Sequence, residues 1–123
     1  MAMNQQGMQE EIAKAQQLQQ QLQMIMSQKQ QLEAKSKDLE RALDEVNRLE
    51  EETPVYKEVG EILVQVEDKE ELISELEDDK ESTDVRLKSL KSKEEKLRDQ
   101  FKEIQEKLSS QMGGMQQGPQ GGA

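Results

Sequence analysis

The sequence contains no cysteine and no histidine among its 123 residues. Disulfide bonds, thiol nucleophiles, ordinary zinc ligation and proton transfer by imidazole at neutral pH are therefore excluded. Tryptophan is also absent, and one tyrosine and one phenylalanine are the only aromatic residues. A chain with so few bulky side chains and a mean hydropathy of -1.04 has little material for a rounded core, so we do not expect a compact globule.

Other functional signals are missing as well. The sequence has no glycine-rich phosphate loop, no G-x-S-x-G elbow and no EF-hand spacing, so we expect neither an enzyme nor a bound cofactor or metal. A formal net charge of -10 repels phosphates and argues against nucleic-acid binding. The start of the chain has no basic stretch leading into an apolar run, and no run of about 18 apolar residues occurs, so we expect no signal peptide, no membrane span and no membrane partner. A cytoplasmic location follows by default.

What the sequence does contain is a regular pattern of leucine, glutamate, lysine and glutamine, which is typical of extended helices. The chain is interpreted as a single, mainly α domain with a short polar lead-in. The predicted segments are a helix at about 8–52, a β-hairpin at 55–66, a helix at about 69–111 and a flexible Gly/Gln/Met tail at 112–123.

Each predicted helix carries a heptad repeat, the pattern of a coiled-coil seam. The seam of the first helix consists of Ala15, Leu18, Leu22, Ile25, Lys29, Leu32, Ser36, Leu39, Leu43 and Val46. The seam of the second helix consists of Ile73, Leu76, Lys80, Thr83, Leu87, Leu90, Glu94, Leu97, Phe101, Ile104 and Leu108. The first helix would be about 65 Å long.

Sequence signals also mark the helix ends. Thr53 before Pro54 is expected to end the first helix, because a residue preceding proline avoids the helical region. Asp68 with Glu71 three residues later predicts a capping box at the start of the second helix. Gly113 and Gly114 are expected to stop that helix.

Two seams of similar length joined by a short connector predict an antiparallel coiled-coil hairpin. Pairing Val46 with Ile73 at the connector places Ser36 opposite Thr83, and it brings Lys29 near Glu94. We therefore expect the polar seam residues to fix the register at some cost in stability. The alternative is a scaffold or tether built from a parallel coiled-coil homodimer, in which the connector would be a break in a longer rod.

The connector is rich in β-branched residues, with Gly60-Glu61 as a tight turn. An isolated two-stranded hairpin is marginally stable in water and leaves its edges and apolar side chains exposed, so this one needs partner subunits. Pairing with other hairpins into a closed β-barrel would satisfy the edges. The predicted subunit interface comprises Val55, Tyr56, Val59, Gly60, Ile62, Leu63, Val64 and Val66.

These features together resemble the beta-type subunits of the chaperone prefoldin. The resemblance rests on the Gln-rich first helix, on Val55-Tyr56-Lys57-Glu58-Val59-Gly60 leading into Ile62-Leu63-Val64, and on the second long helix. It covers about residues 10–110, and the single hairpin matches the beta type, because alpha-type subunits carry two. The resemblance implies a hexamer of two alpha and four beta subunits whose hairpins form a double β-barrel platform. It also implies that the coiled-coil tips hold non-native polypeptides and pass them to a group II chaperonin without ATP.

Methionines are dense at both ends of the chain, which an antiparallel hairpin brings to the same tip. Thioether side chains adapt to irregular apolar surfaces, which suits a binder of many unfolded chains. Fraying of the last turns would add apolar seam residues to this surface. The predicted client-binding residues are Met8, Ile12, Ala15, Ile104, Leu108, Met112 and Met115, with Met1 and Met3 near them.

Overall fold

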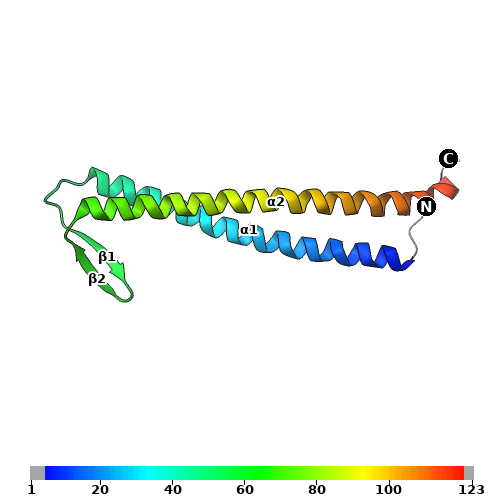
Figure 1. Ribbon diagram of the computed structural model, residues 1–123, viewed down its shortest axis with the longest axis horizontal. Helices are drawn as coiled ribbons and strands as arrows, with labels where there is room; N and C mark the ends of the chain where they lie inside the picture. Colours follow the sequence, from blue (N-terminus) through cyan, green and yellow to red (C-terminus); the bar gives the residue numbers. More distant parts are fainter. Residues whose placement is uncertain (1–4, 121–123) are drawn as a thin grey trace. The chain divides into compact units, whose positions relative to one another are not determined.

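A computed structural model describes the backbone of residues 5–120 and the side chains of residues 5–111. It contains two long helices, α1 (Gln5–Arg48) and α2 (Lys69–Gln120), joined by the strands β1 (Val55–Val59) and β2 (Ile62–Val66) (Figure 1). The predicted fold class, two long helices connected by one β-hairpin, is confirmed.

The chain divides into two compact units. The terminal unit comprises residues 1–28 and 90–123, and the hairpin unit comprises residues 29–89. Each unit therefore contains one part of α1 and one part of α2, and the hairpin unit also contains both strands. The single domain expected from the sequence stays a prediction.

The heptad pattern is confirmed by burial. Every predicted seam residue of both helices is buried or half-buried, whereas most positions between them are exposed. The best buried apolar side chains are Leu22 and Ile104 in the terminal unit and Leu87 in the hairpin unit. Thr83 is more buried than any of them, at 3% exposure. A two-helix seam buries only one stripe of each helix, which is why so few side chains are fully enclosed.

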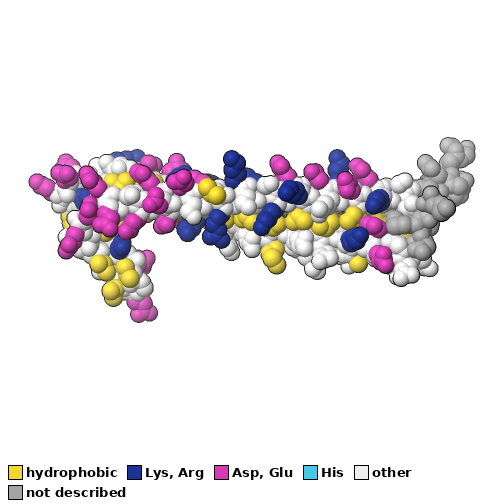
Figure 2. Space-filling model, viewed as in Figure 1, with side chains coloured by type: hydrophobic (Ala, Val, Ile, Leu, Met, Phe, Trp, Pro, Cys, Tyr) yellow, Lys and Arg dark blue, Asp and Glu magenta, His cyan; other side chains and the backbone are white. Residues whose placement is uncertain are grey.

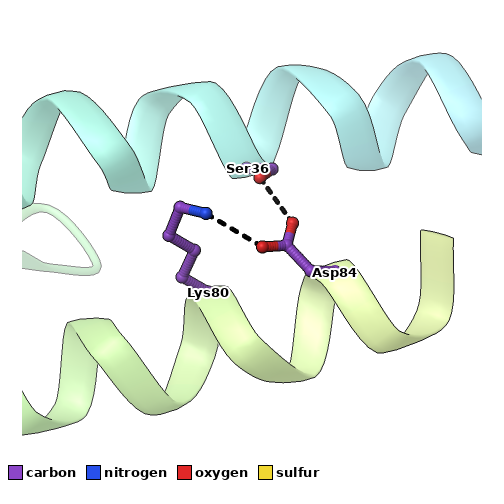
Figure 3. A network of polar contacts seen from close by, with 3 residues as sticks. All are labelled: Ser36, Lys80 and Asp84. Carbon is purple, nitrogen blue, oxygen red and sulfur yellow. Dashed lines mark hydrogen bonds and ion pairs between the residues drawn. The ribbon is translucent and has the colours of Figure 1, made fainter. Parts of the chain in front are cut away.

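The predicted register is confirmed in the hairpin unit. The hydroxyl of Ser36 on α1 donates a hydrogen bond of 2.7 Å to Oδ1 of Asp84 on α2, next to Thr83, the residue predicted to face Ser36 (Figure 3). A slip of one heptad would have placed Ser36 opposite Leu76 or Leu90. The connector forms a β-hairpin, and α1 contacts α2 of the same chain. The alternative of a parallel homodimer with a simple break at the connector is therefore wrong.

The polar layer contains more than the two hydroxyl residues expected. Lys80 on α2 donates a hydrogen bond of 2.9 Å to Oδ2 of Asp84, so Asp84 accepts from Lys80 and from Ser36 at once (Figure 3). The bond from Lys80, then that from Ser36, lowers the pKa of the Asp84 carboxyl. The bond to Asp84 and its negative charge raise the pKa of Lys80.

The first helix ends earlier than expected. α1 stops at Arg48, four residues before the predicted end at about residue 52. The Leu49 amide bonds back to the Val46 carbonyl at 3.3 Å, and the Thr53 amide bonds to the Glu50 carbonyl at 3.0 Å. Glu50, Glu51 and Glu52 follow the helix, and negative charge is unfavourable at a helix C-terminus. This repulsion acts before the sequence reaches Pro54.

The second helix begins as expected and ends later. The Glu71 amide donates to Oδ1 of Asp68 at 3.2 Å, which confirms Asp68 as the N-cap. α2 then continues to Gln120, so the predicted stop at about residue 111 is wrong. Glycine weakens a helix by about 1 kcal/mol relative to alanine but does not forbid helical dihedral angles, so Gly113 and Gly114 do not force an end. Residues 121–123 of the predicted tail lie outside the described residues.

The connector is the predicted hairpin. β1 and β2 are antiparallel, with Val55 opposite Val66 and Val59 opposite Ile62. Gly60 has φ of +59°, and Glu61 has a negative φ. A positive φ at the first of two loop residues is the pattern of a type II′ turn, which requires glycine there and matches the twist of the strands.

Candidate functional site

The hairpin has one strongly apolar face. Residues directly opposite in an antiparallel pair point to the same side of the sheet. The observed register therefore gives one face five aliphatic side chains and one lysine, and gives the other face a mixed set. The apolar face consists of Val55, Lys57, Val59, Ile62, Val64 and Val66. The second face consists of Tyr56, Glu58, Leu63 and Gln65.

Most of this surface is open to solvent. Leu63 is 69% exposed and Ile62 is 62% exposed, and Tyr56, Val59 and Val64 are also exposed. Only Val55 and Val66, at the base of the hairpin, are half-buried. Figure 2 shows hydrophobic side chains at the surface of the hairpin, with acidic side chains beside them. All of the predicted interface residues lie on the hairpin, and none of them is fully buried.

Lys69 connects the base of the hairpin to the end of α1. Its Nζ donates hydrogen bonds to the backbone carbonyls of Glu50 at 2.7 Å and Glu51 at 2.8 Å. An open hollow of 990 Å³ lies here and is lined mainly by polar residues, among them Glu51, Glu67, Asp68 and Lys69. Lys69 thus satisfies carbonyl groups that the early end of α1 leaves without helical partners. Sequence reasoning missed this role, since only the tertiary fold brings residues 50 and 69 together.

The terminal unit contains the predicted client-binding residues. Ile12 is 42% exposed, Met8, Ala15 and Leu108 are half-buried, and Ile104 is buried at 8% exposure. Ile12 is therefore accessible without fraying, whereas Ile104 needs the helices to separate. The side chains of Met112 and Met115, and the residues Met1 and Met3, lie outside what the structure describes.

The same unit exposes two methionines that the sequence analysis did not assign. Met24 is 64% exposed, and Met26 is also exposed on the flank of α1. Nη2 of Arg98 on α2 lies 3.7 Å from Sδ of Met26 and 3.2 Å from Oε2 of Glu94. The sequence does contain a signal for them, because both methionines lie outside the heptad seam, at positions where coiled coils usually have polar residues.

No group of three His, Cys, Asp or Glu residues within the described part of the chain is arranged to hold a metal ion. Within residues 5–120, neither helix includes a stretch long and apolar enough to traverse a lipid bilayer.

Known proteins share this arrangement. Residues 9–115 match the family described as prefoldin subunit. The prefoldin subunit beta of Archaeoglobus fulgidus is 50% identical over 99 residues, which cover 80% of this chain and 84% of the relative. The prefoldin subunit beta of Methanosarcina acetivorans is 39% identical over 105 residues, covering 85% of this chain and 89% of the relative.

A solved structure agrees with the sequence comparisons. The crystal structure of the prefoldin beta subunit from Thermococcus strain KS-1 superposes with a TM-score of 0.75 at 33% identity. The match covers 84% of this chain and 90% of that one. Together with two long helices that flank a single exposed hairpin, these similarities show that the chain belongs to the prefoldin family, as a beta-type subunit.

Proposed function

We propose that the chain is a subunit of an ATP-independent chaperone that binds non-native polypeptides, prevents their aggregation and delivers them to a group II chaperonin. The observation that carries this proposal is the exposed apolar hairpin between two long helices, in a chain that belongs to the prefoldin family. The chain acts in this proposal by binding and not by catalysis, and its place of action is the cytoplasm, where it would meet such clients.

The hairpin is the proposed assembly element. Within the described residues, the outer edges of β1 and β2 pair with no further strand, and burying a large apolar side chain contributes about 1.5–3 kcal/mol. Sheet formation with the hairpins of other copies and of an alpha-type subunit would bury these side chains. We propose the resulting assembly to be a hexamer of two alpha and four beta subunits that is built on hairpin barrels.

The client-binding site is proposed to include the start of α1 and the end of α2. Ile12 supports this proposal, since it is an aliphatic side chain exposed on a helix whose other large aliphatic residues lie mostly in the seam. Met8 and Leu108 lie partly exposed in the same unit. The flexible thioether side chain of Met8 suits clients that share no sequence.

The test is aggregation of a denatured protein, measured by light scattering. Guanidinium-denatured citrate synthase would be diluted without nucleotide into buffer, into the purified chain, or into the chain mixed with an alpha-type prefoldin subunit. The mass of each assembly would be measured in parallel. We expect scattering to be suppressed by a complex of hexameric mass. An inert, elongated homodimer would contradict the proposal.

A pair of variants tests the client site separately. Ile12→Glu should weaken suppression several-fold without changing the mass of the assembly, because it places a charge in the proposed apolar surface. Val85→Glu is the matched control, since Val85 is an exposed β-branched residue on α2 in the hairpin unit. Equal activity of Ile12→Glu and the wild type would remove Ile12 from the proposed site.

A further inference from the structure

One segment of α1 in the terminal unit has no charge. Between Lys14 and Lys29, 14 consecutive residues contain no Asp, Glu, Lys or Arg, although 36% of the whole chain is charged. The segment contains seven glutamines and two methionines. We call residues 15–28 the neutral segment.

The side chains of the neutral segment separate into two sets. Ala15, Leu18, Leu22 and Ile25 are buried or half-buried in the seam. All seven glutamines, both methionines and Ser27 are exposed. Figure 2 shows a mainly white surface, with few charged side chains, over this part of α1. The outer surface of the segment therefore consists of amides, thioethers and one hydroxyl.

Comparison between equivalent heptad positions shows that packing does not require this composition. Met24 is followed at heptad intervals by Gln31, Asp38 and Glu45, all of them exposed. The heptad position two residues further along carries Ile12, Gln19 and Met26, and then Glu33 and Glu40. Coiled coils usually place charged residues at such positions, and α1 does so at the first position from Asp38 onward and at the second from Glu33 onward. The loss of charge is thus confined to the terminal unit.

We propose that the neutral segment binds extended, non-native polypeptide, continuing the client surface that begins at Ile12. This inference rests on the proposed function and adds a second set of contacts to it. A glutamine amide has both a donor and an acceptor, as a peptide group does, so it can bond to the backbone of any unfolded chain. Met24 and Met26 supply adaptable apolar contacts for client side chains. A surface without charge neither repels nor selects a client by the sign of its charge.

Charged residues of α2 bound the neutral segment on one side. Met26 lies against the guanidinium of Arg98, which is also bonded to the carboxylate of Glu94, so charged groups of α2 line one side of the segment. Ile12, Gln19 and Met26 repeat every seven residues and form one flank of α1, which makes the neutral segment continuous with the exposed Ile12. An occupant at Ile12 would therefore meet uncharged surface along the same helix.

The first test is site-specific photo-crosslinking in the assembled oligomer. The photoreactive residue p-benzoyl-phenylalanine would replace Met24 or, as the control, Asp38. Asp38 lies two heptads further along α1 and is also exposed. The probe is reduced, carboxymethylated α-lactalbumin, a chain that stays unfolded. We expect the yield of probe adduct to be several-fold higher from position 24 than from position 38. Equal yields, or an adduct from position 24 to another subunit, would overturn the inference.

The second test adds charge. The double variant Gln17→Glu/Met24→Glu places two carboxylates on the neutral segment, and Gln31→Glu/Asn47→Asp places two at exposed positions of α1 in the hairpin unit. We expect only the first variant to bind the probe several-fold more weakly, with unchanged assembly mass and helix content. Wild-type binding with no difference between the variants would overturn this inference but leave the proposed function intact. Absence of probe binding by the wild type would overturn both.

Discussion

Asp84 joins the seam residues Ser36 and Lys80 in one hydrogen-bond network between the helices. Asp84 is adjacent to the seam position Thr83, and it accepts hydrogen bonds from Ser36 across the interface and from Lys80 one turn away on its own helix. The bond from Ser36 joins the two helices and depends on this register, whereas the bond from Lys80 lies within α2 and does not. The network is partly exposed, so its contribution to stability is modest, while its geometric requirement is strict.

The Asp84 network predicts a pH-dependent stability. Since folding lowers the pKa of Asp84, its contribution is present above the ordinary aspartate value of about 3.9 and is lost as pH falls through the lowered value. Folding raises the pKa of Lys80, so that contribution is present below about 10.4 and is lost as pH rises through the raised value. Asp84→Asn should lower the Tm by a few degrees at pH 7, and this difference should shrink as the pH falls through the lowered pKa of Asp84.

Circular dichroism melts at a series of pH values would measure this difference. Asp79→Asn is the control, because it removes the same charge from an exposed position of α2. A Tm difference between Asp84→Asn and the wild type that does not shrink as the pH is lowered would contradict an electrostatic origin.

Lys69 is a second residue whose role depends on the fold. Its ammonium group bonds to the carbonyls of Glu50 and Glu51, after the last turn of α1. Lys69→Met keeps the approximate length of the side chain and removes both hydrogen bonds. We therefore expect the free energy of unfolding to fall by about 1 kcal/mol. Thermal or urea melts would measure the loss. Lys37→Met, at an exposed position of α1, should be neutral, and equal losses in both variants would count against the capping role.

Among the secondary-structure elements, the helices and the hairpin differ in how far the chain itself satisfies their backbone hydrogen bonds and buries their apolar side chains. The helices satisfy their own backbone hydrogen bonds and bury their seams against each other within each unit. The hairpin satisfies one edge of each strand and leaves the other edges and most of its side chains exposed. This contrast supports the proposal that the hairpin is the assembly element, while the helices supply the internal stability of the chain.

The register of the helices can be tested by crosslinking, because the chain has no native cysteine. Ser36→Cys with Thr83→Cys should form an intramolecular disulfide rapidly on oxidation, since the helices already hold these positions in one layer. Ser36→Cys with Leu90→Cys, one heptad away, should react far more slowly. Mobility on a non-reducing gel reads out both, and faster reaction of the second pair would show that the register is displaced.

At the scale of the whole molecule, the exposed hairpin predicts that oligomerisation and helix content respond to different substitutions. Ile62→Asp places a carboxylate on the apolar face and should prevent assembly, since each interface side chain is worth about 1.5–3 kcal/mol and recurs in every copy. Val85→Asp is a matched control, because Val85 and Ile62 are both 62% exposed and both β-branched. Size-exclusion chromatography with light scattering would give the masses.

The expected result is a small species for Ile62→Asp and a full assembly for Val85→Asp, both with wild-type helix content by circular dichroism. Assembly of Ile62→Asp at the wild-type mass would show that the hairpin face is not the interface.

The elements, the seam and the register of the helices in the hairpin unit could all be predicted from the amino-acid sequence. The heptad repeat, the β-branched connector and Gly60 are local signals, and each records a backbone geometry that neighbouring residues impose on one another. Pairing Ser36 with Thr83 followed from matching two such patterns. The helix ends were less well determined, because α1 ends before Pro54 and α2 continues past Gly113 under forces that a single residue type does not show.

The polar contacts between distant residues, and the exposure of particular apolar side chains, could not be predicted in this way. Asp84 lies outside the predicted seam, and its partner Ser36 is 48 residues away; Lys69 bonds to carbonyls 18 and 19 residues before it. Such contacts depend on how far side chains reach across an interface, which no periodic pattern encodes. In the same way, the seam predicts that Ile104 faces inward, but its burial and the exposure of Ile12 and Met24 are properties of two packed helices and not of either alone.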